Sequence, residues 1–257
     1  MDKKYFFFDI DGTLTDLKTK KIVPSALTAL RELEASGHFV AIATGRAHYK
    51  ARKFLNEVGL HNMVCCGGGG LVIDNELVEN IPLDLVKAKA IVAQAEALGI
   101  GILLMLDDSE KVYSKNNSFV ETVGERQEPT TYIIDPDMDY QTLPQIYKIY
   151  LALSKEDETK LTLKDTLGNL RFVPEYLMFQ YDAKKDGILS MMKHLNADPK
   201  DVVVFGDDYN DMVMFDPLWT SIAMGNANDD LKQKADYVTD ANIDNGIYNA
   251  CKHFKWI

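Results

Sequence analysis

The feature that most constrains this chain is a short apolar strand that ends in two carboxylates. Residues 5–8 form an uninterrupted aromatic run, which is typical of a buried strand, and Asp9 and Asp11 follow it. Gly12 then breaks the extended conformation, and ligands bind at such strand ends in open α/β sheets. Two neighbouring acids repel each other unless a cation or a shared proton relieves the repulsion. The segment therefore indicates a metal site, an acid–base role, or both.

The same residues could form an ordinary turn, because an isolated Asp-x-Asp-Gly segment is usually solvated. They could also begin an EF-hand loop, which requires Gly at its sixth position and Glu at its twelfth. This chain has Leu14 and Lys20 at those positions, so an EF-hand is excluded. The functional interpretation of the two acids therefore depends on partner residues further along the chain.

Size and composition describe a soluble globular chain of one large domain or two small ones. The chain has 257 residues, of which 46% are hydrophobic and 26% are charged, and its formal net charge is -11. That charge argues against nucleic acid or an anionic membrane as the main partner. It also repels a phosphorylated substrate at long range, so any phosphate site must supply its own positive field.

The cysteines and the N-terminus favour a cytoplasmic protein without disulfide bonds. Cys65 and Cys66 are adjacent and Cys251 is the third cysteine, which is not the pattern of a disulfide framework. Lys3 and Lys4 precede an apolar run, but acidic residues end that run too soon for a signal peptide or a membrane span.

Strand and helix patterns alternate at both ends of the chain, which predicts an α/β core with a mainly parallel sheet. The middle shows adjacent strands joined by short turns, which is typical of antiparallel pairing. We therefore expect a core domain of residues 1–81 and 183–257, and an inserted α+β domain of residues 82–182. The expected helices cover residues 24–36, 47–58, 83–98, 155–167 and 187–195, with short ones near Phe119 and from Asp211. The expected strands cover residues 5–8, 38–43, 63–66, 100–106, 111–114, 146–153, 170–173, 177–180, 202–205, 221–224 and 237–239.

A second group of carboxylates comes after a second buried strand. Residues 202–205 are apolar, Gly206 turns the chain, and Asp207, Asp208 and Asp211 come next. Alone, this segment is as easily a turn as a site. Together with the first pair of acids, it offers hard oxygen ligands from two strand ends. That is the ligand set of Mg²⁺, with water and substrate phosphate completing the coordination.

Two further elements suit phosphate. Thr44, Gly45 and Arg46 place a hydroxyl and backbone N–H groups where a strand leads into a helix, although such a Thr is often only a helix cap. Lys184 and Lys185 precede another helix. They could be solvated surface residues, or one of them could neutralise the charge of a nucleophile and a phosphate.

These four elements together resemble the motifs of the haloacid dehalogenase (HAD) superfamily of phosphohydrolases. The motifs read DIDGT at 9–13, AIATGR at 41–46, a lysine shortly before Gly-Ile, and GDDYND at 206–211. The tail at 222–247 is also similar to the Cof-type branch (subfamily IIB), which includes sugar phosphatases. The resemblance implies a Rossmann-like core with a C2B-type cap inserted between the second and third motifs.

The resemblance also implies a role for each matching residue. Asp9 is similar to the nucleophile that forms an aspartyl-phosphate, and Asp11 to the general acid and base. Asp9, the backbone carbonyl of Asp11, and Asp207 match the Mg²⁺ ligands of the family. The other matches are Thr44, Gly45, Lys184 and Asn210 as phosphate or nucleophile contacts, and Asp211 as an orienting carboxylate.

Two positions depart from the family pattern. Alignment backwards from GDDYND places Lys184 at the lysine position, but the family often has Gly directly after that lysine, and Lys185 stands there. We favour Lys184 over Lys185. The second departure is the glycine run at 67–70, which replaces the usual Asn-Gly and allows the backbone to approach a ligand closely.

The resemblance implies a Mg²⁺-dependent phosphatase acting on a small phosphorylated metabolite through an aspartyl-phosphate. The alternatives are a phosphotransferase or mutase with the same intermediate, a phosphoacceptor regulatory protein such as a receiver, and an inactive binding module. The short spacing between Thr13 and Pro24 leaves no room for another cap, so we expect specificity to come from the inserted domain. There, Tyr113, Asn116 and Arg171 are candidate contacts, although ordinary strand or surface roles explain each more simply.

Overall fold

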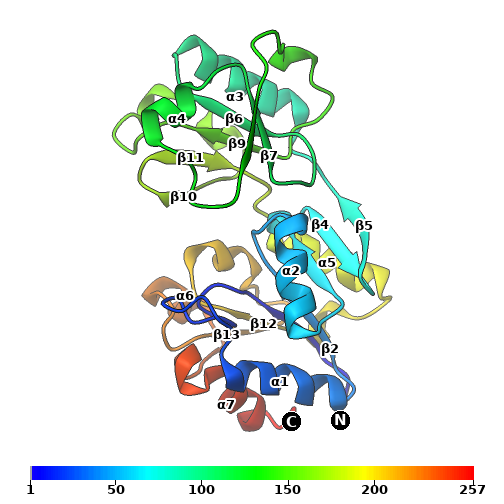
Figure 1. Ribbon diagram of the computed structural model, residues 1–257. Coiled ribbons are helices and arrows are strands. Elements are labelled where there is room, and N and C mark those ends of the chain that lie inside the picture. The colour runs from blue at the N-terminus through cyan, green and yellow to red at the C-terminus, as the bar shows by residue number, and fades with distance from the viewer. Residues whose placement is uncertain (1) are drawn as a thin grey trace. The chain divides into compact units, whose positions relative to one another are not determined.

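The computed structural model describes residues 2–257, which form two compact units (Figure 1). The first, here called the core unit, is the chain up to Asn80 together with Ala183–Ile257. The second, here called the inserted unit, is Ile81–Asp182. The sequence predicts a division after residues 81 and 182, so the first boundary differs by one residue.

Eight strands form the core sheet, and neighbouring strands are hydrogen-bonded. In order across the sheet they are β14 (Tyr237–Val238), β13 (Thr220–Ala223), β12 (Val202–Gly206), β1 (Tyr5–Phe8), β2 (Phe39–Ala43), β3 (Met63–Cys65), β4 (Gly70–Ile73) and β5 (Glu76–Asn80). The pairings from β14 to β3 are parallel. β4 and β5 extend the sheet as an antiparallel hairpin that the sequence pattern did not predict.

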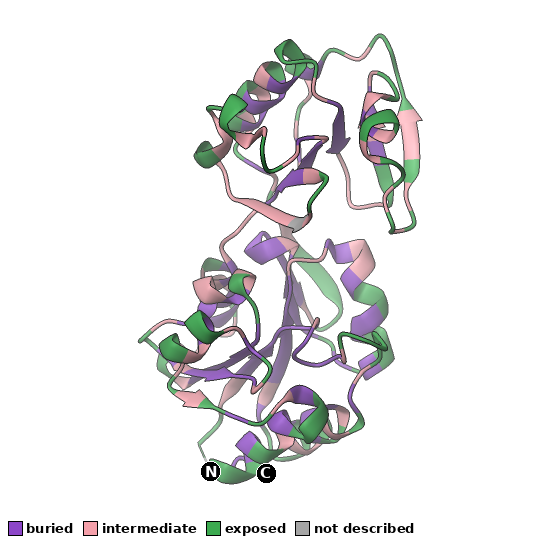
Figure 2. Ribbon diagram, turned by 90° about the vertical axis from the view of Figure 1, so that its left-hand side faces the viewer, coloured by how far each residue is buried: buried purple, intermediate pink, exposed green. Residues whose placement is uncertain are grey.

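From β13 to β4 both faces of the core sheet are buried, whereas β5 at its edge is largely exposed (Figure 2). Phe6 and Phe8 belong to one apolar cluster and Phe7 to the other, as the two-residue period of a strand covered on both sides requires. The first cluster includes side chains of α1 (Pro24–Ala35), α2 (His48–Val58) and α7 (Gly246–His253). The second includes side chains of α5 (Lys184–His194), the 3₁₀ turn η6 (Tyr209–Met214) and α6 (Asp229–Lys234).

The inserted unit contains a second sheet of six strands. Their order is β10 (Asn169–Val173), β11 (Tyr176–Phe179), β9 (Lys148–Leu151), β6 (Ile102–Met105), β7 (Lys111–Ser114) and β8 (Thr131–Ile134). The pairings are antiparallel except that between β7 and β8. One face packs against α3 (Leu85–Ala97), and α4 (Ser118–Val123) follows β7 in the chain.

The predicted helix over residues 155–167 is wrong. The structure has two 3₁₀ turns there, η3 (Glu158–Lys160) and η4 (Lys164–Thr166). Leu161 and Leu163 pack against the same apolar cluster, but residues two apart do not share a face of an α-helix. The backbone N–H of Leu163 instead donates to the side chain of Gln94 on α3, at 3.1 Å.

The predicted fold class is confirmed: the core is α/β with a mostly parallel sheet, and an α+β unit with its own sheet is inserted into it. Among residues 2–257, no helix combines the length and the apolar composition that crossing a membrane requires.

Candidate active site

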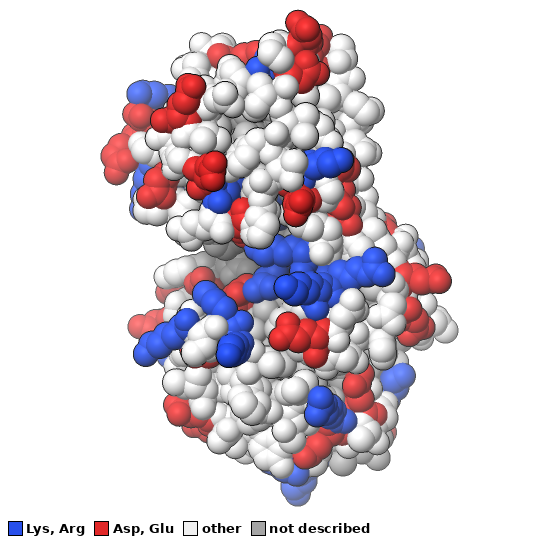
Figure 3. All heavy atoms as spheres, in the orientation of Figure 1, with Lys and Arg blue, Asp and Glu red and all other residues white. Residues whose placement is uncertain are grey.

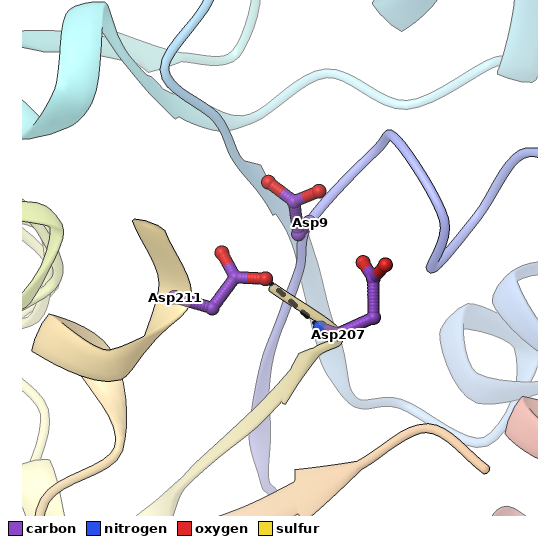
Figure 4. Close-up of side chains that lie close together, drawn as sticks. All are labelled: Asp9, Asp207 and Asp211. Carbon is purple, nitrogen blue, oxygen red and sulfur yellow. Dashed lines mark hydrogen bonds between the residues drawn. The ribbon is translucent and has the colours of Figure 1, made fainter. Parts of the chain in front are cut away.

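The site lies where β1 and β12 end side by side. The two strands are parallel and in register, with Phe8 opposite Phe205, so the residues after them leave the sheet at the same edge. The backbone N–H of Asp9 still donates to the carbonyl of Phe205, at 3.0 Å. Asp207 comes two residues later, and Figure 4 shows the carboxyl groups of Asp9, Asp207 and Asp211 lying close together. Parallel pairing alone therefore brings together acids that are almost 200 residues apart in the chain.

Lys184 joins two of these carboxylates. Its Nζ lies 2.7 Å from Oδ1 of Asp9 and 2.5 Å from Oδ1 of Asp211, and its side chain is only 1% exposed. Lys184 is the first residue of α5, so the helix projects it from its N-terminal turn. Lys185 points elsewhere: its Nζ pairs with Asp216 at 2.6 Å, and its side chain is 37% exposed. The structure thus brings Lys184, and not Lys185, to Asp9.

The site buries more carboxyl groups than one lysine can neutralise, and the pKa values of these groups reflect that imbalance. Burial, together with repulsion from Asp211, raises the pKa of Asp9 to about 7, even though Lys184 opposes the shift. Burial, together with repulsion from Asp9, raises the pKa of Asp207 to about 8. Burial disfavours the charge of Lys184, but Asp211 and Asp9 outweigh that effect and raise its pKa above the ordinary value. One lysine is therefore not enough to neutralise three buried acids.

Both carboxylate oxygens of Asp211 already accept hydrogen bonds within the protein. Its Oδ1 accepts from Lys184, and its Oδ2 accepts from the backbone N–H of Asp207 at 2.9 Å and of Asp208 at 3.3 Å. The residue is 0% exposed, and it closes a capping box with Asp208 at the start of η6. These bonds suit a carboxylate that orients the strand end and the lysine.

Asp9 and Asp207 keep oxygen atoms that a cation could use. One oxygen from each of Asp9, Asp207 and Asp211 lies within 4.8 Å of the others, which is an arrangement that could hold a metal ion. A divalent cation would relieve the repulsion that raises the pKa values of Asp9 and Asp207. The donor set is all oxygen, which fits Mg²⁺ better than a softer metal. The residues present therefore fit the cation that the sequence predicts.

Asp11 has surroundings unlike those of Asp9. Its side chain is 43% exposed, and both of its oxygens accept hydrogen bonds from the guanidinium of Arg46. The backbone N–H of Arg46 donates to Oγ1 of Thr44 at 3.2 Å. Thr44 itself is buried at the end of β2, beside the end of β1. Gly45, between Thr44 and Arg46, is half-buried.

Asn210 is the predicted site residue that the structure does not tie to the others. It lies half-buried in η6, and its side chain forms no hydrogen bond with any of residues 2–257. An amide without an internal partner is available to a ligand, but the geometry of the protein alone assigns it no contact.

The glycine run at 67–70 serves close packing between backbones. Gly68 has a φ of +111°, and a Cβ built there would lie 2.2 Å from the carbonyl oxygen of Ala183 and 2.9 Å from the nitrogen of Lys184. The carbonyl of Gly67 also accepts from the N–H of Ala183, at 2.8 Å. A side chain at Gly68 would push away the turn that presents Lys184 to Asp9.

Sequence reasoning missed residues that hold the first motif in place. Thr13 donates through Oγ1 to Oδ1 of Asp207 at 2.9 Å. Asn226 donates to the carbonyl of Gly12 at 2.9 Å, and Asn242 donates to that of Thr15 at 2.8 Å. The available signal was the similarity of the 222–247 tail to the Cof-type branch, which contains both asparagines.

The candidate residues of the inserted unit bond to near neighbours. Tyr113 donates to Asp107 at 3.1 Å, and Oδ1 of Asn116 accepts from the N–H of Ser118 at 2.9 Å. Arg171 lies 2.8 Å from Glu158 in a partly buried ion pair. These contacts support ordinary structural roles for all three.

Exposed cations lie near the motifs of the core unit. Figure 3 shows Lys and Arg side chains gathered on the face of this unit that carries α2. The exposed basic residues near the first and second motifs in the chain are Lys18, Lys20, Lys21, Arg52 and Lys53. In a chain of net charge -11, they are candidates for the local positive field that the sequence predicts for a phosphate site.

Comparison with known proteins agrees with the geometry. The family model of the haloacid dehalogenase-like hydrolases matches residues 6–251. A relative from Bacillus subtilis, named "Putative phosphatase YkrA", is 30% identical and the match covers 98% of each chain. The pyridoxal phosphate phosphatase YbhA of Escherichia coli is 26% identical, with 96% of this chain and 97% of that one covered. A solved HAD subclass IIB sugar phosphatase superposes with a TM-score of 0.79 at 25% identity, over 99% of this chain and 100% of that one. The chain therefore belongs to the haloacid dehalogenase-like hydrolases, in their Cof-type branch, and is an enzyme of that family.

Proposed function

We propose that this enzyme is a Mg²⁺-dependent phosphatase that hydrolyses a small phosphorylated metabolite through an aspartyl-phosphate on Asp9. The observation that carries the proposal is the buried carboxylate of Asp9, held by Lys184 at 2.7 Å and flanked by Asp207. A fixed, desolvated carboxylate with a free oxygen suits nucleophilic attack on phosphorus.

In the proposed reaction, an oxygen of Asp9 bonds to phosphorus while the bond from phosphorus to the leaving oxygen breaks. Asp11 gives its proton to that leaving oxygen, and the alcohol departs. Asp11 then takes a proton from water, whose oxygen attacks phosphorus, so that inorganic phosphate leaves and Asp9 is regenerated. Lys184, Thr44 and the N–H of Gly45 offer donors to the phosphoryl oxygens.

Asp9, Asp207 and the backbone carbonyl of Asp11 would hold the Mg²⁺. When bound, the ion supplies charge stabilisation to the phosphoryl group and offsets its repulsion by the acids. Asp211 orients the site through its bonds to Lys184 and to the backbone of Asp207.

The substrate class rests on the relatives. One relative's name specifies pyridoxal phosphate and a solved neighbour is a sugar phosphatase, so both are phosphatases of small phosphorylated metabolites. We propose the same class for this enzyme and a cytoplasmic location, where such metabolites occur.

A panel of phosphorylated sugars, nucleotides and cofactors tests the proposal. We expect release of free phosphate in MgCl₂ and its loss in EDTA, and isomer formation without phosphate release would instead indicate a mutase. Asp9→Asn should abolish turnover, because an amide cannot attack phosphorus, whereas the exposed Asp186→Asn should be fully active. Activity of Asp9→Asn within tenfold of the wild type would refute the role of Asp9.

A further inference from the structure

Arg46 belongs to the second motif, but the proposed reaction gives it no task. Its guanidinium grips Asp11 as a fork: Nε lies 3.0 Å from Oδ2, while Nη2 lies 2.7 Å from Oδ1 and 2.8 Å from Oδ2. Paired contacts of this kind fix geometry as well as charge. Within residues 2–257, the carboxyl group of Asp11 accepts its hydrogen bonds from this one side chain.

The backbone of Arg46 is itself held by hydrogen bonds to neighbouring residues of the site. The N–H of Arg46 donates to Thr44 Oγ1, and its carbonyl accepts from the N–H of Cys66 at 2.8 Å. Its guanidinium also lies 5.9 Å from the ring centre of Phe54 on α2. Arg46 is therefore held at both ends, and it connects the loop after β2 to the side chain of Asp11.

The fork occupies both oxygens of Asp11. A proton can pass to a leaving group only from an oxygen that faces it, so at least one contact with Arg46 must open during the reaction. Thr44 and Gly45, which we propose as phosphate ligands, directly precede Arg46. The phosphate of a bound substrate is thus a nearby anion that can compete with Asp11 for the guanidinium.

Resting on the phosphatase function proposed above, we propose that Arg46 is the positioning residue for Asp11. It holds the carboxylate in one place before substrate binds, and it turns in part to the substrate phosphate. This frees one oxygen of Asp11, which takes up a proton from the solvent and gives it to the leaving oxygen as the bond from phosphorus breaks. Arg46 thereby couples phosphate binding to proton delivery.

Two substrates that differ in their need for a proton test this role. Nitrophenolate leaves as a stable anion, whereas the alkoxide of an alkyl phosphate requires protonation. We would measure kcat/KM, which reports steps through the first phosphoryl transfer, for p-nitrophenyl phosphate and for glycerol 1-phosphate. In Arg46→Gln, we expect kcat/KM for the alkyl substrate to fall about 10- to 100-fold more than for the aryl substrate.

Arg46→Lys separates charge from geometry. Lysine restores a positive charge but not the planar fork. The KM values of both substrates should recover towards the wild type, while the alkyl-to-aryl ratio of kcat/KM stays depressed. The matched control is Arg31→Gln, an exposed arginine on α1, which should change neither quantity.

A double-mutant cycle with Asp11→Asn completes the test. Once Asp11 cannot deliver a proton, Arg46→Gln should no longer change the alkyl-to-aryl ratio. Two results would show that Arg46 only binds phosphate or supports the fold. Arg46→Gln would lower kcat/KM equally for both substrates, or it would have the same effect in the Asp11→Asn background as in the wild type. Either result would overturn this inference and leave the proposed phosphatase function standing. A wild-type enzyme that hydrolyses no phosphate ester would overturn the proposed function, and this inference with it.

Discussion

The candidate site residues of the core unit and those of the inserted unit bond over different distances along the chain. In the core unit, the ion pair of Lys184 with Asp9 joins residues 175 positions apart, and Thr13 reaches Asp207 across 194 positions. In the inserted unit, Tyr113 reaches only six positions and Arg171 only 13. The difference teaches that parallel strands that end together can assemble a site from distant parts of the chain, whereas Tyr113 and Arg171 bond to groups near them in the sequence.

We expect the largest difference in stability and activity between variants of two adjacent lysines of the core unit, Lys184 and Lys185. Lys184→Met removes the cation between two buried carboxylates, and we expect the free energy of unfolding to fall by about 3–5 kcal/mol and catalysis to be lost. Lys185→Met removes a more exposed pair with Asp216 and should cost at most about 1 kcal/mol. Urea unfolding and phosphate release measure both, and equal losses in the two variants would contradict the assignment of Lys184.

A glycine from each unit sharpens the comparison. Gly68→Ala in the core unit combines a left-handed backbone with a clash against Ala183, and we expect a loss of about 2–4 kcal/mol and of activity. Gly99→Ala in the inserted unit has a φ of +69° but no atom within 4 Å of the new Cβ. Backbone strain alone should cost it about 1–2 kcal/mol, without loss of activity. A harmless Gly68→Ala would show that the glycine run does not position Lys184.

Arg171 tests whether a long polar side chain of the inserted unit is structural. Arg171→Gln breaks its pair with Glu158 and its bond to the carbonyl of Pro174, so we expect about 1.5–3 kcal/mol of destabilisation. The ranking of substrates by kcat/KM should not change. Lys160→Gln, which removes an exposed pair with Asp157, is the control with little effect on either measurement. A changed substrate ranking in Arg171→Gln would identify this residue as a specificity contact after all.

The smallest effect concerns His38, at the edge of the core unit away from the motifs. Its Nδ1 accepts from the N–H of Lys4, and its Nε2 lies 3.2 Å from the carbonyl of Trp256, so the neutral ring fits both partners. Burial lowers the pKa of His38 below its ordinary value, although the bond to Trp256 opposes the shift.

The unfolded chain therefore binds a proton at His38 before the folded chain does. Stability from His38 is fully present above about pH 6.5 and is lost as the pH falls towards the lowered pKa of the folded state. Thermal unfolding from pH 7.5 to 5.5 should show a smaller decline in His38→Gln than in the wild type. The exposed His194→Gln should decline like the wild type, and a decline in His38→Gln as steep as in the wild type would contradict the linkage.

The sequence determined those features that depend on local pattern and on chain order. The apolar runs before Asp9 and before Asp207 are too short for a buried helix and long enough for a buried strand. The α/β class could therefore be predicted, and so could the position of both acids at the same edge of the sheet. The hairpin of β4 and β5 was missed, and the helix over 155–167 was wrong. There, the contacts of Leu161 and Leu163 with distant residues outweighed local helical pattern.

Only the tertiary structure decided which of two similar neighbouring side chains is buried and which charged group each one pairs with. Lys184 and Lys185 are neighbours with the same chemistry, yet Lys184 is buried against Asp9 and Lys185 pairs with Asp216. Asp9 and Asp11 likewise share one motif, yet one is buried against a lysine and the other is held half-exposed by Arg46. Burial and the nearest opposite charge depend on elements far away in the chain, and no local pattern of residues encodes them.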